Sequence, residues 1–159
     1  MTDADAPLPW YETASVPALL RHARTVYGTA MHAALAAIDC DDMPRNGMYV
    51  IGGLALGAGG VPLGRLVKEL RVSKQAAGQL VDTLVLRGYL DRTTDPDDRR
   101  RLTVALTARG EAAAAAQARA RERIDADLKA RVGSTCVAEL RRALGALCDM
   151  GMAAGEGEA

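Results

Sequence analysis

The sequence predicts a mainly α-helical chain with one small β-hairpin, and three observations lead to this class. Apolar residues recur at helical spacing over most of the 159 residues. Large apolar residues recur at every second position in one place, residues 102–106, just after a turn sequence rich in Asp. Hydrophobic residues make up 49% and charged residues 25%, which is the balance of a globular protein and excludes a disordered or fibrous chain.

Two apolar helices are expected in the first third of the chain. The first covers Val16–Ile38, because its apolar residues fall on one helical stripe. Asp39–Asn46 is polar, and Pro44 marks a break within it. The second helix covers Gly47–Leu56, and Gly57–Val61 then forms a loop.

A pair of helices joined by a short turn is expected next. Pro62 suits the first turn of a helix, where its missing N–H costs nothing, and residues 63–70 supply an apolar stripe. Ser73 is the expected N-cap of the second helix, Lys74–Leu86, and Gly88 is its expected C-cap. The apolar face of this second helix consists of Ala77, Leu80, Val81, Leu84 and Val85, and its polar face of Lys74, Gln75, Gly78, Gln79 and Asp82.

A β-hairpin and a long helical region complete the chain. Tyr89–Thr93 and Leu102–Leu106 are the expected strands. Thr107 can cap a helix that runs to about Val132, where the Gly133-Ser134 pair breaks it. A last helix carries Val137, Leu140, Leu144 and Leu147.

The order helix, short turn, helix, hairpin is that of a winged helix-turn-helix, an arrangement that binds DNA. Gln75 and Gln79 lie one helical turn apart on the same face, and glutamine can bond adenine through two hydrogen bonds in the major groove. Lys74 can reach a phosphate or a guanine. The hairpin tip carries three consecutive arginines, 99–101, which suit a narrow minor groove.

The distribution of charge supports the same interpretation. The chain has 20 basic and 20 acidic residues, so its net charge is zero. Residues 1–61 carry three basic and six acidic residues (−3), residues 62–110 ten and six (+4), and residues 111–159 seven and eight (−1). Only the middle third is basic, which favours an anionic partner for that third.

Several segments of this basic third resemble MarR-family transcriptional regulators. Val72–Asp82 resembles the family's recognition helix, and Arg87–Arg92 resembles the strand that follows it. Asp95–Arg100 and Leu106–Gly110 resemble the wing and the start of the next helix. The resemblance is strong over about Pro62–Glu111, and outside this range only the helical pattern agrees.

The resemblance implies a homodimer whose N- and C-terminal helices interlock, with two winged lobes on a pseudo-palindromic site in double-stranded DNA. Asp98 and Arg100 correspond to the wing pair in which the arginine enters the minor groove and the aspartate orients it, and Arg99 would be a phosphate neighbour. The DNA-contacting positions that the resemblance implies are Ser73, Lys74, Gln75, Ala76, Gln79, Arg92, Asp98, Arg99 and Arg100.

The resemblance also implies how such a protein works. Most family members repress transcription, and a small molecule bound between the dimer region and the winged lobe relieves the repression. A sequence-specific cytoplasmic regulator without cofactor, metal or catalytic activity is therefore expected. The sequence names neither the effector nor the residues of its pocket.

One domain with five parts is expected. Its parts are a flexible arm (1–15), N-terminal helices that contribute to dimerisation (16–61), the winged helix-turn-helix (62–110), C-terminal dimerisation helices (111–152) and a frayed tail (153–159). The acidic N-terminus has no basic segment followed by an apolar run, so no signal peptide is expected.

Three other function classes were weighed against DNA binding. An enzyme is disfavoured because the only histidines, His22 and His32, have no carboxylate or cysteine at ligand spacing, and the cysteines form no metal motif. A redox-sensing regulator of the same fold would use Cys40, but the neighbouring acids should raise the pKa of its thiol and make it less reactive. A helical interaction protein that does not bind DNA is the remaining alternative.

Overall fold

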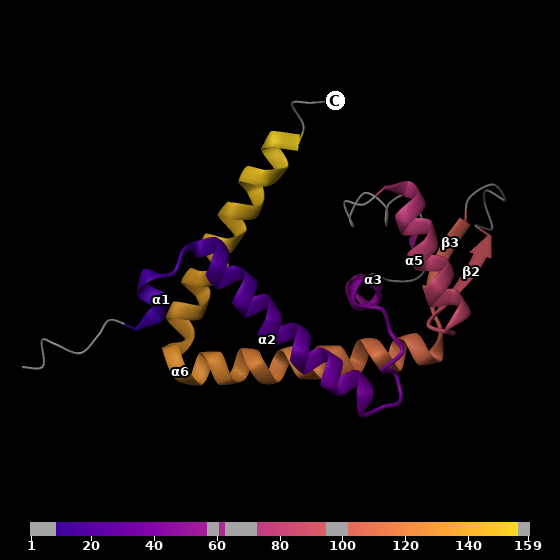
Figure 1. Cartoon of the computed structure of the whole chain (residues 1–159), viewed down its shortest axis with the longest axis horizontal. Coiled ribbons are helices and arrows are strands. Elements are labelled where there is room, and N and C mark those ends of the chain that lie inside the picture. Colours follow the sequence, from indigo (N-terminus) through magenta and orange to yellow (C-terminus); the bar gives the residue numbers. More distant parts are fainter. Residues whose placement is uncertain (1–8, 57–60, 63–72, 95–101, 156–159) are drawn as a thin grey trace, which may run out of the picture. The chain divides into compact units, whose positions relative to one another are not determined.

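The computed structural model describes residues 9–56, 61–62, 73–94 and 102–155. Met1–Arg121 and Glu122–Ala159 form two compact units. The elements are α1 (Trp10–Thr13), α2 (Val16–Ala36), α3 (Arg45–Ala55), β1 (Val61–Pro62), α5 (Lys74–Leu86), β2 (Leu90–Thr94), β3 (Leu102–Leu106) and α6 (Ala108–Gly155) (Figure 1). The mainly helical class with a β-hairpin is confirmed, whereas the helix expected at 62–70 has residues 63–70 outside the described residues.

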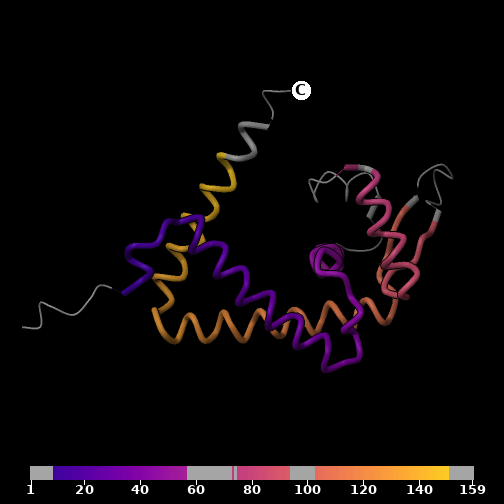
Figure 2. Tube along the Cα trace, in the orientation of Figure 1, coloured from indigo at the N-terminus to yellow at the C-terminus, as the bar shows by residue number. Residues whose placement is uncertain are grey.

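The N-terminal helices agree with the expectation except at their ends. α2 ends at Ala36, two residues before the predicted Ile38, and the chain then turns through Asp39, whose φ is +54° (Figure 2). Pro44 is the N-cap of α3, and its carbonyl accepts hydrogen bonds from the N–H groups of Gly47 and Met48, so the predicted break at Pro44 is confirmed. The expected flexible arm 1–15 contains the one-turn helix α1, which corrects that prediction for residues 10–13.

The helix α5 begins and ends where its caps predict. The Ser73 hydroxyl accepts a hydrogen bond from the Ala76 N–H at 3.2 Å, which satisfies one donor of the first turn. Gly88 has a φ of +72°, a conformation that glycine adopts without steric cost, and its N–H donates to the Val85 carbonyl. Both capping predictions are therefore confirmed.

The sheet has one more strand than the sequence predicts. β2 and β3 form the expected antiparallel hairpin, with Leu90 opposite Leu106. β1 pairs with the other edge of β3, with Val61 opposite Val104, so the strand order is β1-β3-β2. The prediction that Val61 ends a loop and Pro62 starts a helix is wrong for these two residues. Pro62 is compatible with a strand because β1 lies at the sheet edge, where a missing N–H leaves no central ladder bond unmade.

The core of the first unit joins α3, α5 and the sheet. The apolar face predicted for α5 is confirmed, because Ala77, Val81 and Leu84 are fully buried. Figure 1 shows α5 alongside β2, the strand with which it is in contact. The largest fully buried side chains are those of Tyr89, Leu35, Ile51, Leu84, Leu90, Gln117, Val50, Val81 and Val104.

Two glycines mark close approaches between elements of this core. A Cβ on Gly47 of α3 would lie 2.9 Å from Leu84 Cδ2 of α5. A Cβ on Gly110 of α6 would lie 2.2 Å from the Tyr89 carbonyl oxygen. Both distances are shorter than real Cβ contacts, so the passage of α3 past α5, and of α6 past the start of β2, depends on the absence of a side chain.

The helix α6 starts as predicted and is broken as predicted. The Thr107 hydroxyl accepts from the Gly110 N–H at 3.0 Å, and Gly133 interrupts the helix with φ +84° and ψ +160°. The helix continues through Gly155, and the frayed tail predicted for 153–159 stays a prediction. No helix in the described part of the chain is both long and apolar enough to cross a membrane.

Candidate nucleic-acid interface

The helix α5 presents a polar face to solvent. Gln75, Ala76 and Gln79 are exposed, on the side opposite the buried Ala77 and Val81. The burial of one face therefore holds the two glutamines outward, where base edges could be reached. The structure brings both together with Ser73 at the start of one helix, as the sequence predicts.

The start of α5 suits the approach of a phosphate. Its first turn contains no acidic residue, so the partial positive charge of the helix N-terminus is not neutralised there. Lys74 is the first residue of this turn, although its side chain lies outside the described residues. A Cβ on Gly78 would meet nothing within 4 Å, so packing within the chain does not require this glycine.

The structure pairs Arg92 with a residue of the same exposed surface. The Arg92 guanidinium on β2 forms an ion pair and a hydrogen bond with the Asp82 carboxylate on α5. Both side chains remain exposed. Sequence reasoning placed Arg92 against DNA and did not foresee this partner, because nothing in the local pattern of either residue marks the other.

The wing tip is held at its two ends by paired strands. Thr94 at the end of β2 lies opposite Leu102 at the start of β3, so the chain returns to the same place after residues 95–101. The predicted wing residues Asp98, Arg99 and Arg100 lie outside the described residues.

A network of hydrogen bonds joins Asp39 and Asp42 of the α2–α3 turn to Tyr89 and Arg109. The Tyr89 hydroxyl donates to the Asp42 carboxylate, and the Arg109 guanidinium donates to the same carboxylate at 3.0 Å. Arg109 also donates to the Asp39 carbonyl at 3.0 Å, and its Cζ lies 4.3 Å from the centroid of the Tyr89 ring. The network ties the α2–α3 turn to the start of β2 and the start of α6.

The network changes the titration of its members. The hydrogen bond from Tyr89, assisted by the positive charge of Arg109, lowers the pKa of the Asp42 carboxyl below its ordinary value. Burial, together with the hydrogen bond to Asp42, raises the pKa of Tyr89, so its phenol stays protonated and remains a donor. Sequence reasoning missed this network.

Cys40 lies in the core next to this network. Its side chain is buried, whereas those of Cys136 and Cys148 are exposed. Burial removes the access that a redox-sensing thiol needs, which weighs against the alternative based on Cys40. Among the described residues no group of three or more His, Cys, Asp or Glu side chains is arranged to hold a metal ion.

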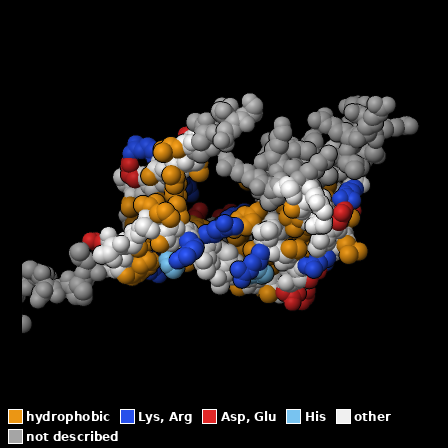
Figure 3. All heavy atoms as spheres, turned by 45° about the horizontal axis from the view of Figure 1, so that its top comes forward, with side chains coloured by type: hydrophobic (Ala, Val, Ile, Leu, Met, Phe, Trp, Pro, Cys, Tyr) orange, Lys and Arg blue, Asp and Glu red, His pale blue; other side chains and the backbone are white. Residues whose placement is uncertain are grey.

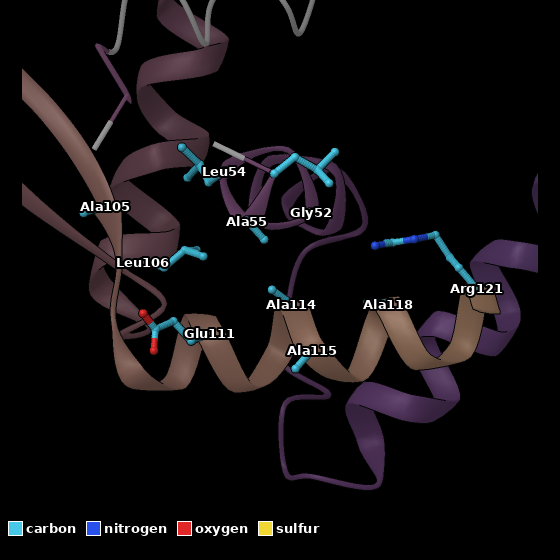
Figure 4. Close-up of a pocket in the computed structure, with 11 residues that line it drawn as sticks. Gly52, Leu54, Ala55, Ala105, Leu106, Glu111, Ala114, Ala115, Ala118 and Arg121 are labelled. Atoms are coloured by element: carbon cyan, nitrogen blue, oxygen red, sulfur yellow. The ribbon is translucent and has the colours of Figure 1, made fainter. Parts of the chain in front are cut away.

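A cavity of about 490 Å³ lies between α3, β3 and the first part of α6 (Figure 4). Its walls are mostly small and apolar, and include Gly52, Ala114 and Ala118, with Arg121 reaching toward α3. Beside it, the buried Gln117 has a side-chain oxygen without a hydrogen-bond partner among the described residues. An ideal Cβ on Gly52 would lie 3.6 Å from an Arg121 nitrogen and 3.8 Å from this oxygen.

Comparison with known proteins agrees with this geometry. The model of the MarR family matches residues 41–101, which include α3, α5 and β2 and end just before β3. This middle segment of the chain is similar to the MarR family. No curated protein sequence matches it significantly.

Solved MarR-type structures share the fold of this chain. *Streptococcus pneumoniae* FabT in complex with DNA is 17% identical with a TM-score of 0.70, covering 86% of this chain and 96% of FabT. A MarR transcriptional regulator from Methanosarcina mazei Go1 is 17% identical with a TM-score of 0.68, covering 91% and 98%. RV1404 from Mycobacterium tuberculosis is 27% identical with a TM-score of 0.64, covering 85% and 90%.

Proposed function

We propose that this protein is a MarR-family, sequence-specific regulator of transcription that binds double-stranded DNA as a cytoplasmic homodimer, without catalysing a reaction. The observation that carries the proposal is the polar face of α5. Gln75 and Gln79 stand exposed on a helix whose opposite face is fully buried, and whose start is capped by Ser73. The proposal is supported by the fold shared with FabT, whose structure was determined in complex with DNA.

The homodimer is supported by exposed apolar residues on the helices that flank the winged lobe. On α2, Val16 is 61% exposed and Val26 is 56% exposed. On the last part of α6, Leu140 and Leu147 are each nearly half exposed. Apolar side chains of this size at repeated helical positions are typical of surfaces that a second chain covers.

We further propose that the protein is a repressor and that a small molecule in the cavity beside Arg121 relieves repression. Within the described part of the chain, the Arg121 guanidinium donates to the Met31 thioether at 3.6 Å and forms no ion pair, and the Gln117 side-chain oxygen has no hydrogen-bond partner. The alanine-lined wall would cover an apolar body. An apolar acid with a hydroxyl or amide donor fits these groups.

Selection of bound sequences from a random duplex pool, followed by gel shifts on the selected site, tests DNA binding. Wild-type protein should enrich a pseudo-palindrome, and its affinity should fall about 10³–10⁵-fold between 50 and 200 mM salt if about 6–10 phosphates are neutralised. Gln75→Ala or Gln79→Ala should cost roughly 1–3 kcal/mol on the selected site and relax base preference. Arg131→Ala, an exposed α6 substitution, is the control.

The wing is tested by comparing its three arginines. Arg100→Ala should weaken binding more than alanine at 99 or 101, and should reduce the preference for A·T-rich flanks. Asp98→Ala should give a milder form of the same defect. Equal losses at all three arginines would mean that the wing is only a nonspecific basic patch. Enrichment of no sequence at all, together with a flat salt response, would overturn the proposed function.

A further inference from the structure

A second cavity lies between α2 and α3, and its lining is basic although the N-terminal third of the chain is acidic. It has a volume of about 520 Å³, and three arginines line it: Arg21, Arg24 and Arg45. His32 lies among them, and none of the described residues that line the cavity is acidic. Residues 1–61 carry more acidic than basic residues, so this cavity gathers all three basic side chains of an otherwise acidic third.

Tyr49 holds one of these arginines, Arg24, without neutralising its charge. The Nε of Arg24 donates to the Tyr49 hydroxyl at 2.8 Å, and its Cζ lies 5.0 Å from the centroid of the Tyr49 ring. Tyrosine fixes the guanidinium plane but leaves its charge and its terminal N–H groups free for another acceptor. In the described part of the chain none of the three arginines forms an ion pair with a carboxylate.

The start of α3 adds to the positive potential. Arg45 and Asn46 are its first two residues, and both line the cavity. The N-cap is Pro44, which provides no side-chain acceptor, and the first turn has no acidic residue. The orphan N–H groups and the partial positive charge of this helix end therefore face the same cavity wall as the arginines.

Gly28 leaves room for a ligand. It lines the cavity in the middle of α2, and a Cβ built there would meet nothing within 4 Å. Thr25 and Thr29 flank it and add neutral hydroxyl groups. In Figure 3, the view of one molecular face, Lys and Arg side chains lie directly beside the histidines.

We propose that this cavity binds a small, multiply charged anion of the phosphate class, such as a diphosphate or a phosphate ester. A single carboxylate would leave at least two of the three guanidinium charges without a counter-charge. A diphosphate supplies several oxygens, and arginine bonds phosphate oxygens through two parallel N–H donors. The proposal does not depend on DNA binding, because neither α2 nor the start of α3 belongs to the proposed DNA surface.

Isothermal titration of the full-length protein with inorganic pyrophosphate tests the site. Wild-type protein should bind with an affinity that falls as chloride is added. Arg24→Ala and Arg45→Ala should each lower the affinity about tenfold or more, because each removes charge-assisted hydrogen bonds. Arg131→Ala, which removes an exposed arginine of α6 that lines neither cavity, should bind pyrophosphate like the wild type.

A substitution that fills the cavity without changing its charge provides an independent test. Gly28 has a helical backbone and open space at its Cβ, so Gly28→Leu should fold as well as the wild type in a thermal melt. Its side chain should fill the cavity and abolish pyrophosphate binding. Wild-type protein that gives no heat with pyrophosphate, or a Gly28→Leu protein that folds and still binds, would overturn the proposal.

Two further measurements test whether the cavity prefers the phosphate class and whether it binds a small ligand or DNA. Benzoate should bind at least tenfold more weakly than pyrophosphate, since it carries one charge. Gel shifts on the selected DNA site should be unchanged by Arg24→Ala and Arg45→Ala. If benzoate binds as tightly as pyrophosphate, the phosphate class is wrong. If DNA affinity falls in both variants, the cavity contacts the DNA backbone, and the assignment to a small ligand is wrong.

Discussion

At the scale of single residues, the ion pair between Arg92 and Asp82 should weaken the proposed DNA binding in two ways. Asp82 places a negative charge on the exposed side of α5, and it also occupies a guanidinium that could contact a phosphate. A surface ion pair of this kind contributes little to stability, so a phosphate can replace the carboxylate at low cost. DNA and Asp82 should therefore compete for Arg92.

Asp82→Asn should strengthen DNA binding several-fold. The change frees Arg92 and removes a repulsive charge, so the dependence of affinity on salt should steepen by roughly one phosphate per subunit. Gel shifts at several salt concentrations measure both quantities. Asp91→Asn, which removes a neighbouring exposed carboxylate, is the control for charge alone. Weaker binding by Asp82→Asn would show that the ion pair instead positions Arg92 for its contact.

The Asp42 network should make stability depend on pH. Because the folded protein lowers the pKa of Asp42 below 3.8, the ionised carboxyl stabilises the fold above that pH. The contribution is lost as pH falls through the lowered pKa. Urea unfolding from pH 7 to 3 should therefore show Asp42→Asn less stable than wild type at neutral pH, with the difference shrinking in acid. A constant difference, or one matched by the exposed neighbour Asp41→Asn, would contradict this.

These residues also show what local sequence patterns can predict. The caps at Ser73 and Gly88 were predictable because each involves residues within four positions along the chain. The Arg92–Asp82 pair spans 10 positions and the Tyr89–Asp42 hydrogen bond spans 47. Such partners are set by how the elements pack, and no periodicity records them.

At the scale of elements, the start of α5 contributes to stability and is proposed to contribute to DNA binding. The Ser73 hydroxyl satisfies an N–H of the first turn, and the same turn is proposed to face phosphate. Substitutions can separate the two roles, because aspartate is as good an N-cap as serine but carries a charge that repels DNA.

Ser73→Ala should destabilise the protein by about 1 kcal/mol, because the N–H of Ala76 loses its acceptor. Ser73→Asp should keep wild-type stability yet weaken DNA binding more than Ser73→Ala does. Thermal melts and gel shifts on the same samples compare the two properties. If Ser73→Asp bound DNA as tightly as the parent, the start of α5 would not lie against phosphate.

The elements that sequence analysis placed wrongly are short or lack a repeating pattern. α5, β2 and β3 follow from clear apolar periodicity and were placed to within one residue. β1 has only two residues, too few for a period of two to be visible, and it exists because β3 offers it a free edge. The one-turn helix α1 likewise has no buried residue to mark it.

At the scale of the whole molecule, the exposed apolar residues of α2 and of the last part of α6 should pack against a second chain in a homodimer interface. Light scattering at micromolar concentration should give twice the chain mass of 16.7 kDa. Leu140→Glu together with Leu147→Glu should shift the equilibrium toward monomer, because two charges would enter an apolar interface. Lys129→Glu, an exposed change on the same helix, should leave the dimer intact. A clean monomer of wild-type protein would refute the prediction.

The fold class followed from the order of the elements, but neither cavity was predictable. The cavity beside Arg121 is lined by an Ala-rich helix, whose sequence shows no cluster of polar residues. The arginines of the anion cavity come from two helices, and Arg45 joins Arg21 and Arg24 only after the turn at residues 37–44 has folded. The shape of a cavity depends on how the elements pack against one another, and sequence periodicity carries no information about that packing.

The close approaches at Gly47 and Gly110 have a consequence for the variation this protein can tolerate. In a library that samples every single substitution, functional survivors should retain glycine at both positions, because even alanine would collide with Leu84 or with the Tyr89 carbonyl. Gly53, Gly78 and Gly145 have open space at the Cβ and should accept alanine without loss of fold. Substitutions at Gly47 and Gly110 would thus be strongly depleted from the library, whereas alanine at the other three glycines would be tolerated. The difference arises from a few tenths of a nanometre between backbones, and it would be visible in a sequencing experiment before any ligand was known.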